Sequence, residues 1–141
     1  MSQLTAARAR YASDAAQTVS PARLLTMLYD RLAADLLAGE EAMLRGDVAG
    51  AGDALTHAQD ILLELHATLD VAAWPEGESL ARLYLWMVTE LMNARLKNQP
   101  GMVADCRQLV LPLRDAWHEA AGTAMTAGGT AATPATTANV G

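Results

Sequence analysis

The stretch from residue 79 to residue 98, SLARLYLWMVTELMNARLKN, constrains the fold more than any other part of the chain. Eight of the ten residues from 83 to 92 are apolar or aromatic and none is glycine or proline, so the stretch predicts a helix. At about 100° per residue, one face of this helix carries an apolar stripe made of Leu80, Leu83, Tyr84, Met87, Leu91 and Ala94. This stripe is enough to dock the helix into the core of a bundle.

A second apolar stripe lies about 120° away around the same helix. It consists of Ala81, Leu85, Val88, Met92 and Leu96. A surface helix of a globular protein needs only one apolar stripe, so something else must cover the second. Two interpretations stay open: neighbouring helices cover it, which makes this helix central, or it forms a groove for an amphipathic helix of a partner.

The rest of the chain predicts three more helices. Ser20 is a good N-cap and Pro21 suits the first helical position, and this helix should end just before Gly46. Its core stripe is Leu25, Leu28, Tyr29, Leu32, Leu36 and Met43. Asp47 then caps a second helix over about 48–70, and the short connection makes the two helices antiparallel neighbours.

The second helix carries its core stripe at heptad spacing, as expected for packing in a bundle. That stripe is Val48, Ala51, Leu55, Ala58, Leu62, Leu65 and Leu69. The last helix should run to about residue 120 on the stripe Met102, Val103, Cys106, Leu109, Val110, Leu113 and Trp117. Pro112 lies inside it and removes a backbone hydrogen bond, which predicts a kink or a break. With no alternating strand pattern, the class is all-α.

The two ends of the chain differ from this helical part. Residues 1–19 are rich in alanine and predict only a short, weak helix around 5–13. Residues 121–141 carry no charge and almost no large apolar side chain, which predicts a disordered tail. The expected organisation is an N-terminal segment (1–19), one bundle domain (20–120) and a tail (121–141).

Charge and composition exclude several kinds of partner. A net charge of −6 argues against nucleic acid, because binding to phosphates depends on lysine and arginine. No stretch approaches the run of about 18 or more apolar residues that a membrane span needs. No secretory signal is recognisable, and the single cysteine, Cys106, suits a reducing cytoplasm.

No catalytic, metal or cofactor site is predicted, and no enzyme. Asp53 and His57 are spaced to share a ligand, but a stable metal site needs three or four converging groups, so a solvated helix face is the simpler interpretation. His66 as a phosphoryl acceptor lacks the nearby lysine and glycine usual in phosphotransfer bundles. Cys106 lies on a core stripe and is expected to be a buried thiol.

Tyr11 stands ten residues before Pro21, and residues 24–30 read LLTMLYD. Together with residues 58–70, 83–98 and 114–117, these pieces resemble the flagellar secretion chaperones (FliS family), which bind flagellin. Residues 24–30 are similar to the family's Leu-x-x-Met-Leu-Tyr-Asp run. The sequence differs from the family pattern where Asp14, Ala16 and Arg31 replace the usual asparagine, valine and glycine.

The resemblance implies an antiparallel four-helix bundle in the cytoplasm. Such a protein binds the C-terminal helical region of flagellin, prevents premature polymerisation and delivers flagellin for export. Tyr11 and the N-terminal segment are then expected to form a movable cover, and the second stripe (residues 81, 85, 88, 92 and 96) the binding surface. Other flagellar export or regulatory proteins are further candidate partners. The alternatives are a homodimeric structural bundle and, less simply, a phosphotransfer or metal-binding bundle.

Overall fold

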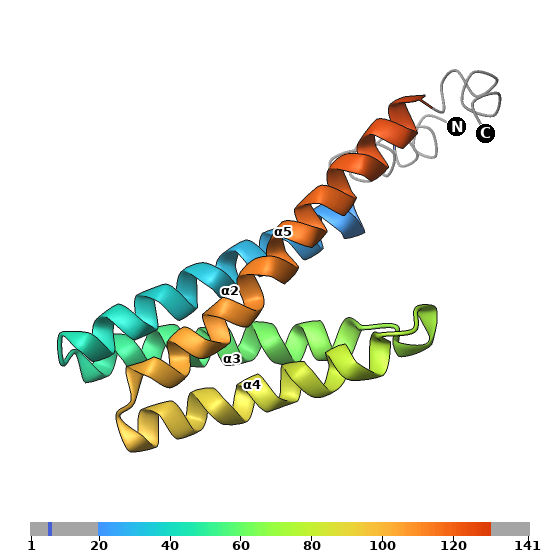
Figure 1. Cartoon of the computed structure of the whole chain (residues 1–141). Helices are drawn as coiled ribbons and strands as arrows, with labels where there is room; N and C mark the ends of the chain where they lie inside the picture. The colour runs from blue at the N-terminus through green and yellow to red at the C-terminus, as the bar shows by residue number, and fades with distance from the viewer. Residues whose placement is uncertain (1–5, 7–19, 131–141) are drawn as a thin grey trace.

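The computed structural model describes residue 6 and residues 20–130, with side chains up to residue 123. Its elements are four long helices, α2 (Pro21–Leu44), α3 (Val48–Thr68), α4 (Gly77–Lys97) and α5 (Pro100–Thr130), and a short 3₁₀ turn, η1 (Val71–Ala73). Successive helices run antiparallel, and these residues contain no strand (Figure 1). The predicted all-α, antiparallel four-helix bundle is confirmed. The expectations for the N-terminal segment with Tyr11 and for residues 131–141 lie outside the described residues.

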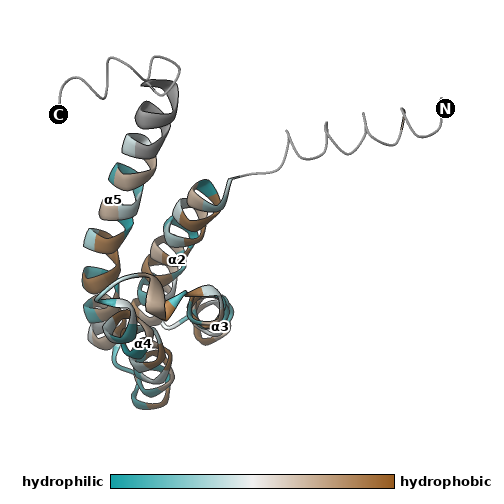
Figure 2. Ribbon diagram, turned by 90° about the vertical axis from the view of Figure 1, so that its right-hand side faces the viewer, coloured by the Kyte–Doolittle hydropathy of each residue, from teal (hydrophilic) through white to brown (hydrophobic). Residues whose placement is uncertain are grey.

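Each helix packs on two others, so the four surround a common core. α2 packs on α3 and α5, and α4 packs on the same two helices. The start of α2 and the end of α5 lie on the same side of the molecule and rise together away from α3 and α4 (Figures 1 and 2). None of the helices between residues 20 and 130 is long and apolar enough to cross a membrane.

Local chemistry sets the helix ends where the sequence predicts them. Ser20 Oγ accepts a hydrogen bond from the backbone N–H of Arg23 at 3.2 Å and caps α2. Gly46 has a φ of 77°, in the left-handed region that glycine adopts readily. The Asp47 carboxylate then accepts from the N–H of Gly50 at 2.9 Å and caps α3. Three residues therefore connect α2 to α3, which forces the two helices to be antiparallel neighbours.

The residues of the predicted core stripes are buried or partly buried, with two exposed exceptions. The buried apolar core includes Tyr29, Leu32, Leu36, Leu55, Leu62, Leu65, Tyr84, Met87, Leu91, Val103, Cys106 and Val110. Val48 is 83% exposed and Leu109 is 41% exposed, so their assignment to the core was wrong. Val48 is the first residue of α3, directly after the turn. A heptad pattern shows which residues share one face of a helix, but it does not show at which residue that face becomes exposed at the end of the bundle.

Helix α5 is longer than predicted. It runs through Pro112 without a break, so the predicted break is excluded. Pro112 and Gln108 are both exposed, and the carbonyl oxygen that loses its helical partner can therefore bind water. The helix ends at Thr130, ten residues beyond the expected end.

An aromatic cluster joins the two diagonally opposed helices, α2 and α4. The hydroxyls of Tyr29 and Tyr84 share a hydrogen bond with 2.5 Å between the oxygens. Trp117 lies against Tyr29, with ring centroids 6.2 Å apart, and Trp74 meets Trp117 edge-on at 5.2 Å. Burial raises the pKa of both tyrosines above the usual value, so both hydroxyls stay protonated and available to each other.

Candidate partner-binding surface

The second stripe of α4 faces away from the core. Leu85 is 44% exposed, Met92 52% and Leu96 79%, while Ala81 and Val88 are half-buried. Val88 packs partly against the core, whereas Leu85, Met92 and Leu96 are left exposed by the helices between residues 20 and 130. Neighbouring helices in this part of the chain therefore cover the second stripe only in part. An apolar surface of this kind on one helix is a typical mark of an interaction site.

The stripe forms one side of a shallow groove against α3, which we call the α3–α4 groove. The groove is bridged at two points: Gln59 Nε2 donates to the backbone oxygen of Val88 at 2.9 Å, and Arg95 Nη1 donates to Thr56 Oγ1 at 3.3 Å. Leu63, exposed one turn beyond Gln59, adds apolar surface on the α3 side. A hollow of about 420 Å³ lies in the groove. Its lining residues are Val48, Gln59, Met92, Arg95 and Leu96.

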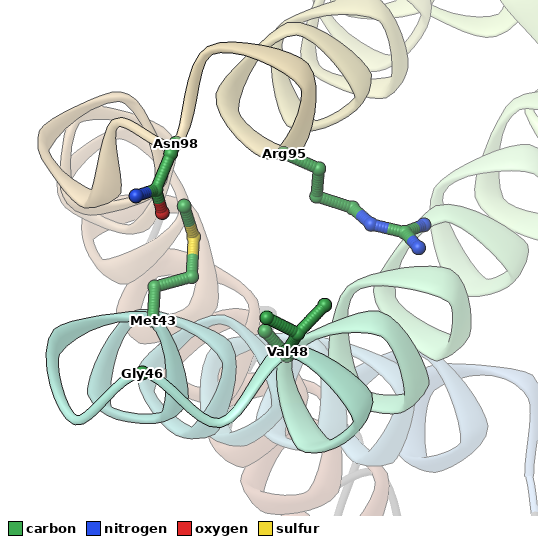
Figure 3. Close-up of a pocket in the computed structure, with 6 residues that line it drawn as sticks. Met43, Gly46, Val48, Arg95 and Asn98 are labelled. Atoms are coloured by element: carbon green, nitrogen blue, oxygen red, sulfur yellow. The ribbon is translucent and has the colours of Figure 1, made fainter.

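A smaller pocket of about 250 Å³ closes this groove where the α2–α3 turn meets the α4–α5 turn. It is lined by Met43, Gly46, Val48, Ala51, Arg95 and Asn98. Figure 3 shows Val48 pointing into the opening and Arg95 reaching from α4 toward α3. Because both hollows share Val48 and Arg95, the pocket and the groove form one continuous surface.

The faces beside α2 are different, because charged groups bridge them. Between α2 and α5, Glu40 Oε1 accepts from Arg107 Nη2 at 2.9 Å and Asp30 Oδ1 from His118 Nε2 at 2.7 Å. Between α2 and α3, the buried carboxylate of Asp35 accepts from His57 Nδ1, and it also accepts from Arg31 Nε of its own helix. These pairs connect α2 to both neighbours, although α2 also keeps Leu24, Met27, Leu37 and Leu44 exposed.

The candidate metal residues do not converge. His57 bonds Asp35 of the neighbouring helix rather than Asp53. Among the described residues no three or more histidine, cysteine, aspartate or glutamate side chains come close enough to hold a metal ion. Cys106 is buried as expected, and burial, with Glu90 and Asp105 nearby, raises the pKa of its thiol to about 12, so the thiol is protonated and unreactive at neutral pH.

Sequence reasoning found the apolar stripe but missed its polar neighbours. Gln59, Thr56 and Arg95 belong to the groove only because α3 and α4 pack in one particular register, which no single-helix pattern contains. The one available hint was Gly52: an added Cβ there would lie 3.1 Å from Arg95 Nη2, so the glycine leaves room for this arginine.

Comparison with known proteins agrees with the resemblance. A family model described as "Flagellar protein FliS" matches residues 3–124. The chain is 30% identical over 110 residues to the flagellar secretion chaperone FliS of Bacillus subtilis, covering 78% of this chain and 82% of the relative. It is 29% identical over 101 residues to that of Vibrio cholerae (71% and 74%) and 30% identical over 108 residues to that of Salmonella typhimurium (75% and 80%).

Proposed function

Because the chain belongs to the FliS family of flagellar secretion chaperones, we propose that it binds the C-terminal helical region of flagellin and keeps it from polymerising before export. Family membership also makes it a chaperone rather than an enzyme. The proposed site of action is the cytoplasm, in keeping with the single, buried thiol of Cys106.

One observation supports this proposal above all: the α3–α4 groove keeps Leu85, Met92 and Leu96 exposed on a helix that is otherwise well packed. An amphipathic helix laid in this groove covers them with its own apolar face, as in other helix-in-groove complexes. Each Å² of apolar area removed from water contributes about 25 cal/mol before the cost of association. Flagellin held in this way has its polymerising face covered, to an extent set by affinity and concentration.

The N-terminal segment belongs to the proposal as a movable cover. Tyr11 is the only aromatic residue before α2, and the groove needs protection when no partner is bound. Removing residues 1–15 should increase the binding of a dye that reports apolar surface, while affinity for flagellin changes little. If the shortened chain unfolds instead, the segment is part of the core and is no cover.

The test of the proposed function is a comparison of two pairs of substitutions on α4. Leu85→Ala with Met92→Ala should weaken binding to the C-terminal segment of the same organism's flagellin by about 1 kcal/mol or more, measured by titration calorimetry. Stability in a denaturant melt should fall little, because both side chains are exposed. Leu83→Ala with Leu91→Ala, on the core stripe, should instead lower stability and affect binding only through unfolding.

Two results would count against the proposal. If the wild-type chain does not bind the flagellin segment, the chain is no flagellin chaperone. If it binds and neither pair weakens it, the binding surface lies elsewhere. The homodimeric bundle is the alternative that the same exposed stripe supports, and it predicts a twofold mass in sedimentation that Leu85→Ala with Met92→Ala reduces to one chain.

A further inference from the structure

Arg95 is fixed in the α3–α4 groove by two features of α3. Its guanidinium lies over Gly52, where an added Cβ would sit 3.1 Å from Nη2, and its Nη1 donates to Thr56 Oγ1 at 3.3 Å. These contacts hold a flexible side chain across the gap between α4 and α3 (Figure 3). The residue lines the groove hollow and the end pocket, and also a third hollow along α3 that it shares with Asp53 and Asp60.

No carboxylate among the described side chains pairs with Arg95. Other arginines in this part of the chain do form ion pairs: Arg31 with Asp35, Arg107 with Glu40 and Arg114 with Asp115. Asp53 and Asp60 line the hollow on the far side of Arg95, but neither comes within ion-pair distance of it. Arg95 is also the only charged residue lining either the groove hollow or the end pocket.

We propose that Arg95 is a specificity-determining contact, which binds an acidic side chain flanking the apolar stripe of the partner helix. An apolar side chain of the same helix fills the hollow between Val48, Met92 and Leu96. In a chain of net charge −6 an acidic group is repelled from most of the surface. The guanidinium therefore fixes the position along the groove at which such a helix stops. This inference rests on the proposed function, since the helix it describes is the flagellin segment.

The experiment measures binding of the flagellin C-terminal segment to the full chain and to Arg95→Met, which keeps the length and apolar stem but removes the charge. Arg82→Met is the matched control, because Arg82 is an exposed arginine of the same helix that donates only to Ser79. We expect Arg95→Met to bind about tenfold more weakly at low salt and Arg82→Met to bind within about twofold of wild type. At about 0.5 M salt the difference between Arg95→Met and wild type should shrink, because screening weakens the charge pair.

The acidic partner is then found by replacing each aspartate and glutamate of the segment with its amide, one at a time. One replacement should weaken binding to wild type and leave binding to Arg95→Met unchanged. A lysine at that position of the segment should restore binding to Arg95→Glu. Thermal melts confirm that each variant is folded.

Three results overturn the inference. In the first, wild type binds the segment and Arg95→Met binds it equally tightly. The chaperone function then stands and Arg95 has no part in it. In the second, amidating the C-terminus of the segment weakens binding to wild type as much as Arg95→Met does. The group that Arg95 binds is then the terminal carboxylate and not a side chain. Failure of wild type to bind at all removes the proposed function itself, and this inference with it.

Discussion

Helices α2 and α4 stand at opposite corners of the same bundle, yet their flanks are built differently. α2 is tied to α3 and α5 by charged groups: Asp35 meets His57, and Glu40 meets Arg107. Beyond their core packing, the described side chains of α3 and α4 are joined by hydrogen bonds to uncharged acceptors, the oxygens of Val88 and Thr56. We call the flanks of α2 the closed half, because ion pairs bridge them. We call the flanks of α4 the open half, because no ion pair among the described residues reaches α4 and its exposed apolar surface can be covered by a partner.

The open half extends to both flanks of α4. On the side away from α3, Trp86 is nearly half exposed, and so is Leu109 of α5. On the side toward α3 lie Leu85, Met92, Leu96 and, from α3, Leu63. α2 also exposes Leu24, Met27, Leu37 and Leu44. What distinguishes the α4 half is therefore the absence of ion pairs on α4 among the described residues, not the number of exposed apolar side chains.

The largest expected effect is the difference in the free energy of unfolding between a leucine substitution in the closed half and one in the open half. Leu36 of α2 is fully buried and Leu96, the second-last residue of α4, is 79% exposed, although both are leucines on apolar stripes. Leu36→Ala should lower the free energy of unfolding by about 2–5 kcal/mol, because it leaves a cavity. Leu96→Ala should change it by about 0.5 kcal/mol or less. Urea melts of both variants measure the difference, and equal losses would mean that the outer stripe of α4 is part of the core.

The next effect tests whether charges close the α2 half. Arg107 and Glu40 are both mostly buried, so Arg107→Met leaves a carboxylate without its donor and should cost about 1–3 kcal/mol. The matched control is Arg114→Met, since Arg114 pairs with an exposed neighbour, Asp115, and should cost about 0.5 kcal/mol or less. A double-mutant cycle with Glu40→Gln isolates the coupling. A coupling near zero would contradict the view that this pair holds α2 on α5.

A smaller effect concerns the hydrogen bond between the two halves. Burial raises the pKa of Tyr29 and Tyr84 in the folded state, so the unfolded chain releases these protons first as the pH rises. Their contribution to stability is therefore complete below about pH 10 and is lost above it, at about 1 kcal/mol per pH unit for one tyrosine. Urea melts between pH 9 and 11 measure this slope.

The control for that slope removes the thiol of Cys106, which is also buried and has a raised pKa. Burial raises the pKa of the Cys106 thiol to about 12, so this residue destabilises the fold in the same direction as the pH rises from about 9. The melts are therefore made in Cys106→Ala, with and without Tyr84→Phe. The slope should be smaller in the phenylalanine variant, and an unchanged slope would show that Tyr84 does not titrate as described.

The last prediction is that deleting the end of the chain has no measurable effect on stability or binding. The chain after Gly122 is rich in threonine, alanine and glycine and carries no charge, so deleting it should leave the melting temperature and flagellin binding unchanged within error. Differential scanning calorimetry checks this. A fall of several degrees would show that the last part of α5 packs on the bundle.

The features that the sequence predicts well depend on residues that lie close together along the chain. Ser20 with Pro21, and Gly46 with Asp47, determine helix ends through atoms only a few residues apart. The two stripes of α4 follow from spacing within one helix. In contrast, His57 lies on the solvated face as expected, with its side chain 47% exposed, but its bond to Asp35 of α2 was not predicted. Such lateral neighbours depend on how helices are arranged, which is also why Arg95 was missed.

The end of α5 was missed for another reason. Composition after residue 120 offers no core and mixes alanine with glycine and threonine, yet the helix continues to Thr130. A helix that has already started gains one backbone hydrogen bond for each further residue, so it can extend beyond its packed part. Hydrophobic content and helix length are separate properties, and a tail prediction based on the first does not determine the second.

The Tyr29–Tyr84 hydrogen bond has a consequence for the orientation of α4. A helix with two apolar stripes has two ways to face a core, and rolling by about 120° would bury Leu85 and Met92. That rolled state would expose the core stripe of Leu80, Met87 and Leu91 instead, so the chain would present a different apolar surface to a partner. It would also pull the Tyr84 hydroxyl away from Tyr29 and leave a buried polar group without a partner, at a cost of about 1–3 kcal/mol. This pair of hydroxyls thus helps to select which of the two stripes faces outward.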